Sequence, residues 1–166
     1  VSTLGKAGPE GVNMTITEES DDKLFRRCVV NNAAYDYISR CNIEDLGITP
    51  PPSELRIWLF NSLEASSSVM LHHGAVLRND LIESFLGKFS RLVEFFMPDI
   101  TIGTKDLRTY KDIYSATCHE LAHSSHFAKV GTDYWDAYIR YVIESYLTSG
   151  GQLYGDGMGA GSGNCE

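Results

Sequence analysis

One stretch constrains the fold more than any other, because its letters, CHELAH, place an H-E-x-x-H motif at His119, Glu120 and His123. Histidines four residues apart lie on the same face of a helix, so both imidazoles can bind one metal ion. Zinc is the expected ion, because neutral imidazole nitrogens suit it and leave room for a third ligand and a water. Glu120 can act as general base toward that metal-activated water. The motif therefore predicts a long central helix that carries a metal site.

Local signals support a helix over about 110–129 around this motif. Thr109 and Asp112 form a capping-box-like pair at its start, and Gly131 can end it. The alternative is a pair of core or surface histidines beside a solvated glutamate. That alternative is less favoured, because burying three such groups without a metal is costly.

Length, composition and net charge limit the kinds of protein that this chain can be. A chain of 166 residues, 43% of them hydrophobic, is long enough for one domain with a core. Its net charge of −8 argues against nucleic acid or an anionic membrane surface as the main partner. No stretch approaches the apolar length of a transmembrane helix, so we expect a chain that does not span a membrane. Because the first residue is Val1, we expect a processed or excised chain.

The hydrophobic pattern predicts an α+β domain in which a small sheet packs on several helices, with the motif on the long central one. The sheet is expected near Ile57–Leu71 and Ile100–Ile102, with a further short strand at Met14–Thr17. Other helices are expected at about 20–40, 79–97 and 133–148, the last antiparallel to the motif helix. The chain divides into a lead-in (1–17), the domain (18–149) and a glycine-rich tail (150–166).

The remaining histidines fit the metal site less well. His72 and His73 end a predicted strand, where neighbouring side chains point to opposite faces and cannot easily share an ion. His126 lies about 10 Å along the helix from His119, too far to share its ion, so it either lines the cleft or is an ordinary polar residue. A metzincin-type extension is absent, because His126 and Lys129 occupy its glycine and third-histidine positions.

The third metal ligand is the open question. Glu144 is the best-placed carboxylate if the following helix packs antiparallel to the motif helix, and it is the tentative third ligand beside His119 and His123. A surface glutamate near a helix end is the competing interpretation for Glu144. Glu166 is a further possibility, although the last residues of a chain are seldom rigid enough to hold a metal.

These residues resemble a known family. His119–His123 and the helix after it are similar to the zincin metallopeptidases, specifically the gluzincin branch, in which a glutamate on a later helix is the third ligand. Ala122–His126 and Asp133–Trp135 also resemble secreted zinc metallopeptidases of gut bacteria. The resemblance covers about Ile57 to Cys165, and only the five-residue motif in it is specific. In that secreted group a glutamate after a segment like Gly159–Cys165 can be the third ligand, which would then lie beyond Glu166.

The resemblance implies a zinc-dependent metallopeptidase that hydrolyses peptide or protein substrates and is secreted, periplasmic or surface-tethered. It implies Zn²⁺ as cofactor and Glu120 as general base. The oxyanion stabiliser stays open among four residues: His126, Tyr134, Arg140 and Tyr141. The main alternative is a catalytically inactive zincin-fold module with a binding or structural role. A cytosolic helical protein with a chance motif is a third possibility, which stoichiometric metal binding would exclude.

Overall fold

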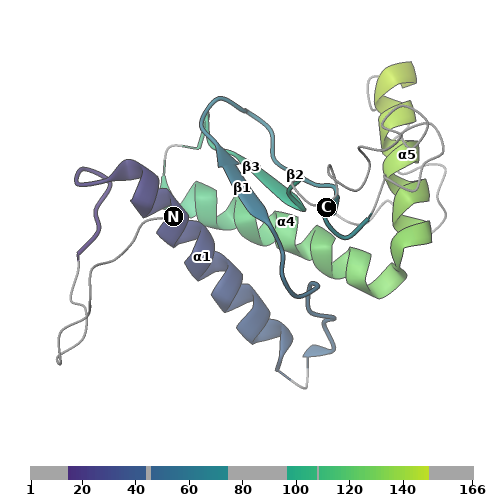
Figure 1. The fold of residues 1–166 in the computed structure, drawn as a ribbon, viewed down its shortest axis with the longest axis horizontal. Helices are drawn as coiled ribbons and strands as arrows, with labels where there is room; N and C mark the ends of the chain where they lie inside the picture. Colours follow the sequence, from purple (N-terminus) through teal and green to yellow (C-terminus); the bar gives the residue numbers. More distant parts are fainter. Residues whose placement is uncertain (1–14, 44–45, 75–96, 108, 150–166) are drawn as a thin grey trace.

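The computed structural model describes residues 15–43, 46–74, 97–107 and 109–149. Within these ranges the chain forms an α+β fold of helices around a small sheet (Figure 1). The helices are α1 (Asp22–Cys41), α4 (Tyr110–Val130) and α5 (Thr132–Ser149), and the strands are β1 (Ile57–Phe60), β2 (Ser67–Ser68) and β3 (Ile100–Gly103). The α+β prediction is therefore confirmed. None of the helices in the described ranges is long and apolar enough to cross a membrane.

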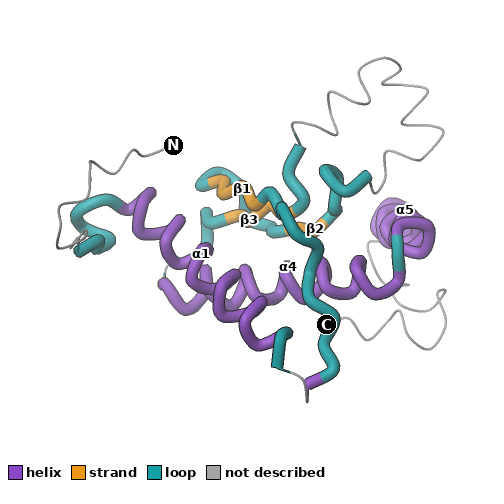
Figure 2. The backbone as a smooth tube through the Cα atoms, turned by 60° about the horizontal axis from the view of Figure 1, so that its bottom comes forward, coloured by secondary structure: helices purple, strands orange, loops and turns teal. Residues whose placement is uncertain are grey.

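β3 is the central strand of the sheet, which has the order β1-β3-β2. It pairs in parallel with β1 and antiparallel with β2. Helices α1 and α4 lie on one side of this sheet (Figure 2). Ile100 and Ile102 of β3 pack with Leu121 of α4, and all three side chains are fully buried. The sheet and α4 therefore share one core, which fixes the side of α4 that faces inward.

The ends of α4 follow the sequence signals. The Thr109 side chain accepts a hydrogen bond from the Asp112 backbone N–H, and the Asp112 carboxylate accepts one from the Thr109 N–H. This capping box is the predicted one. Gly131 ends the helix at a φ of 82°, a conformation that glycine adopts without the strain that a Cβ would bring. The predicted helix at about 110–129 is confirmed.

The second predicted strand is shorter than expected. β2 covers Ser67–Ser68 rather than 66–71, because Met70 adopts a φ of 63° and the chain then turns over 71–74. Thr15–Thr17 is not a strand either, and the Thr17 carbonyl accepts a turn hydrogen bond from the Ser20 N–H. The helix predicted at 79–97 lies almost wholly outside the described residues, as do most of the lead-in and the glycine-rich tail.

The packing of α5 differs from the prediction. Figures 1 and 2 show α5 crossing the end of α4 rather than running back beside it. Gly131 is the only residue between the two helices, and a single residue gives the chain no room for an antiparallel return. Trp135 and Tyr138, from the first part of α5, pack on Phe127 near the end of α4. The antiparallel arrangement predicted from the sequence is therefore wrong.

Candidate metal centre

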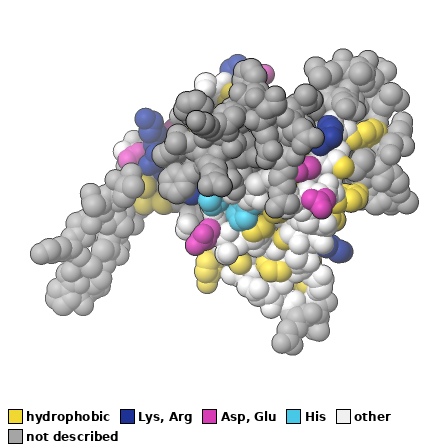
Figure 3. All heavy atoms as spheres, turned by 45° about the vertical axis from the view of Figure 1, so that its right-hand side comes forward, with side chains coloured by type: hydrophobic (Ala, Val, Ile, Leu, Met, Phe, Trp, Pro, Cys, Tyr) yellow, Lys and Arg dark blue, Asp and Glu magenta, His cyan; other side chains and the backbone are white. Residues whose placement is uncertain are grey.

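α4 brings the two motif histidines together as the spacing predicts. The Nε2 atoms of His119 and His123 lie 3.1 Å apart, with the rings perpendicular at a centroid distance of 4.7 Å. Two nitrogens bound to one tetrahedral zinc lie about 3.3 Å apart, because each Zn–N bond is about 2.0–2.1 Å. The two imidazoles are therefore arranged to fit one zinc ion. His119 is exposed, and histidine atoms are visible at the surface in Figure 3.

His123 is the more enclosed ligand candidate. Its ring lies 6.4 Å from the Trp135 ring, centroid to centroid. Burial, and then the nearby His119 and His126 rings, lower the pKa of His123 to about 4. The imidazole is thus neutral at physiological pH, which is the form that binds a metal.

Glu120 is the most unusual residue of the site. Its side chain is 5% exposed, and among the described residues nothing donates a hydrogen bond to its Oε2 atom. Burial raises the pKa of the carboxyl group to about 7. A buried polar atom without a partner costs free energy, so it points to a role that the fold alone does not explain. A cation and a water beside it would supply the missing partners.

His126 lies one turn beyond His123 within a group of aromatic rings. Its ring is 5.5 Å from Trp135, 6.0 Å from Tyr134 and 6.1 Å from Tyr138, centroid to centroid. Burial, and then the charge of Lys129, lower its pKa. The structure thus places His126 beside the histidine pair, while its role at the cleft stays a prediction.

No third ligand is found among the side chains that the structure describes. No group of three histidine, cysteine or acidic residues that could hold a metal occurs there. The side chain of Glu144 lies outside the described residues, as does Glu166. The antiparallel packing that suggested Glu144 is not observed, and the assignment of Glu144 stays a prediction.

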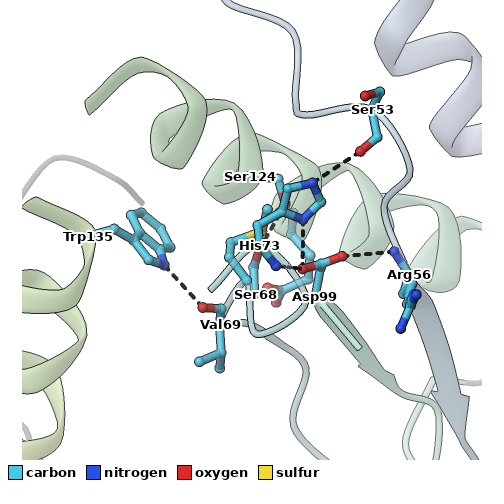
Figure 4. A network of polar contacts seen from close by, with 10 residues as sticks. Ser53, Arg56, Ser68, Val69, His73, Asp99, Ser124 and Trp135 are labelled. Carbon is cyan, nitrogen blue, oxygen red and sulfur yellow. Dashed lines mark hydrogen bonds and ion pairs between the residues drawn. The ribbon is translucent and has the colours of Figure 1, made fainter. Parts of the chain in front are cut away.

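Sequence reasoning missed a polar network beside the site, shown in Figure 4. The fully buried Asp99 carboxylate accepts hydrogen bonds from the backbone N–H groups of Arg56 and His73 and contacts His73 Nδ1 at 2.9 Å. The His73 Nε2 atom lies 3.1 Å from the Ser53 carbonyl oxygen. Both ring nitrogens of His73 are thus engaged, so this histidine is structural. An aspartate directly before a buried strand was the available signal.

A second part of the network ties β2 to the helices. The hydroxyl oxygens of Ser68 and Ser124 lie 2.9 Å apart, and both residues are buried. The Trp135 indole N–H donates to the Val69 carbonyl at 3.4 Å. The segment after β2 is therefore held against α4 one turn from Glu120, and against α5.

The chain was compared with known protein families, curated proteins and solved structures, and none of them matches it.

Proposed function

We propose that the protein is a zinc-dependent metallopeptidase in which His119 and His123 hold the metal and Glu120 is the general base. One observation carries this proposal: two imidazole nitrogens lie 3.1 Å apart, and Glu120, which directly follows the first of these histidines, has a buried carboxyl oxygen with no partner among the described residues. This combination suits a metal that needs a neighbouring base. A pair of structural histidines gives no reason for a buried Glu120 oxygen that lacks a partner in the described part of the chain.

Zinc, when bound, polarises a peptide carbonyl and makes a water more acidic. Residues of the chain hold the metal and transfer the proton. His119 and His123 are the nitrogen ligands, and the low pKa of His123 keeps its nitrogen free to bind. Glu120 accepts a proton at its carboxylate and later donates it to the leaving amine. Burial raises its pKa to about 7, so the group can exchange protons near neutral pH.

The third ligand, the substrate and the location belong to the same proposal. Glu144 is the candidate within the sequence, and Glu166 or a residue beyond it is the alternative. The substrate is a peptide or protein. The protein is expected to act outside the cytoplasm and to adopt a zincin-like fold. These assignments rest on the resemblance to the gluzincins and, for the location, on the resemblance to secreted zinc metallopeptidases.

The first test measures zinc content and peptide hydrolysis in the same samples. We expect about one zinc per chain in the parent protein and none in His123→Ala. His126→Ala is the matched control, because it removes a histidine one turn further along without removing a proposed ligand, and it should keep the zinc. Glu120→Gln should also keep the zinc but lose hydrolysis by about 10²–10⁴-fold. Equal zinc content in the parent and in His123→Ala would contradict the proposed site.

A catalytically inactive zincin-fold module is the second candidate. It follows if neither Glu144 nor a residue at or beyond Glu166 completes the site. In that case the chain binds zinc through His119 and His123, but the parent protein hydrolyses peptides no faster than Glu120→Gln. If the parent is faster, the enzyme is the better description.

A further inference from the structure

An open groove lies between α1 and the segment 52–59, away from the histidine pair. Its volume is about 480 Å³, within the range of ligand pockets. Six apolar residues form much of its lining: Val30, Ala34, Leu55, Ile57, Leu59 and Leu121. The groove therefore has the volume of a small-ligand pocket, and its lining is mostly apolar.

The groove is separate from the candidate metal centre. Leu121 contributes to its lining, and it is two residues from both His119 and His123. Two residues turn a helix by about 200°, so Leu121 points to nearly the opposite side of α4 from both imidazoles. A ligand in the groove would not touch the histidine pair.

The charged groups of the groove lie toward its two ends. Figure 1 shows β1 and the segment before it running in the opposite direction to α1. Arg27, early in α1, therefore lies toward the β1 end of the groove, and Glu54 lies toward the other end. Neither side chain forms an ion pair with another described residue. Asn31, one turn after Arg27, adds an amide group between them.

Glu54 also has an unusual backbone. Its φ is 62°, a left-handed conformation that costs a residue with a Cβ about 1 kcal/mol or more. Strained residues of this kind concentrate at ligand-binding sites, where the surrounding structure holds them in place. The neighbouring Pro52 stiffens the same wall of the groove.

We propose that this groove binds a short apolar peptide with free ends, its carboxylate at Arg27 and its ammonium group at Glu54. Guanidinium and carboxylate form paired charge-assisted hydrogen bonds, and Asn31 can bond a peptide amide in between. The groove follows α1 from Arg27 to Ile38, a rise of about 16 Å. An extended peptide covers about 3.3–3.6 Å per residue, so the groove has room for up to four residues. The inference does not depend on metal binding or hydrolysis.

The test is a calorimetric titration of the full chain with trileucine, carried out on the Glu120→Gln background so that the peptide stays intact. We expect one saturable site with a Kd of about 10–500 μM, in the range of a small ligand with few polar contacts. Arg27→Ala should weaken binding at least about tenfold, because it removes the partner of the carboxylate. Lys23→Ala is the matched control, because it removes a charge from the same helix one turn away and outside the groove.

A peptide without charged ends provides a second test of the proposal. N-acetyl-trileucine amide has the same side chains without end charges, and it should bind at least about tenfold more weakly. Equal binding of the free and blocked peptides, or no saturable binding, would overturn the proposal. So would binding that is lost in His123→Ala but unchanged in Arg27→Ala, because the peptide would then sit at the histidine pair.

Discussion

At the scale of single residues, burial acts on two titratable groups of the motif, Glu120 and His123. Burial raises the pKa of Glu120 to about 7 and lowers that of His123 to about 4, so it favours the neutral form of both. The sequence predicted the register of these residues, because the i, i+4 spacing alone fixes it. It also predicted that the motif is partly buried, but not that Glu120 is buried while His119 is exposed, which depends on how α4 packs against the sheet.

The burial of Glu120 predicts a pH-dependent stability of the metal-free chain. The folded-state pKa, about 7, lies above the ordinary value of 4.5, so this group stabilises the fold fully below pH 4.5 and progressively less as the pH rises through 7. His123 acts in the opposite sense, losing its contribution as the pH falls from 6.5 through 4. Glu120→Gln removes only the first effect, so the comparison of the two chains isolates it.

We expect Glu120→Gln to be more stable than the parent by about 1–3 kcal/mol at about pH 8 and nearly equal at about pH 4.5. Urea unfolding in the presence of a chelator measures the difference. Glu18→Gln, at an exposed position, is the control and should show no such trend. A Glu120→Gln variant that is less stable than the parent at both pH values would show that the carboxylate has a stabilising partner.

At the scale of elements, local chemistry predicted the helices better than the strands. The Thr109–Asp112 capping box and Gly131 set the ends of α4, and both signals are contained within a few residues. β2 was predicted too long because its end depends on the left-handed turn at Met70, where methionine gives no such signal. The length of that strand is decided by contacts distant in sequence.

Gly103, the last residue of β3, lies close to the backbone of residues 63–65. A Cβ placed on Gly103 would lie 2.4 Å from the Ala65 carbonyl oxygen and 2.7 Å from that of Leu63, and both are backbone atoms. We therefore expect Gly103→Ala to lower the free energy of unfolding by about 2–4 kcal/mol, measured by urea unfolding. Gly131→Ala is the matched comparison: it meets no atom within 4 Å and adds only the strain of a φ of 82°. It should cost about 1 kcal/mol. A Gly103→Ala variant no less stable than Gly131→Ala would mean that the 63–65 segment moves freely.

At the scale of the whole molecule, the sequence predicted the α+β class but not how the elements are placed. The order β1-β3-β2 puts the last of the three strands in the middle, and no local pattern encodes that order. The crossing of α4 and α5 follows from a single linking residue and from Trp135 packing on Phe127, a contact between two helices. The third metal ligand depends on the same kind of placement, which is why spacing alone left it open.

The buried Asp99 carboxylate connects three segments of the described chain through hydrogen bonds. This carboxylate, which stands directly before β3, binds the backbone of Arg56 before β1 and that of His73 after β2. The His73 ring then reaches the Ser53 carbonyl. One buried carboxylate therefore fixes the backbone next to all three strands: before β1, after β2 and before β3.

We expect Asp99→Asn to lower the free energy of unfolding by about 3–5 kcal/mol, because an amide cannot accept every hydrogen bond that this carboxylate accepts and leaves the His73 ring without its charged partner. Asp106→Asn, at an exposed position, is the control and should change stability by less than about 0.5 kcal/mol. Urea unfolding followed by circular dichroism measures both. The Asp99→Asn chain should also bind trileucine more weakly than the parent, because Ser53 and Glu54 line the groove beside the His73 contact. A loss of stability below about 1 kcal/mol would show that the three segments are held by apolar packing rather than by this carboxylate.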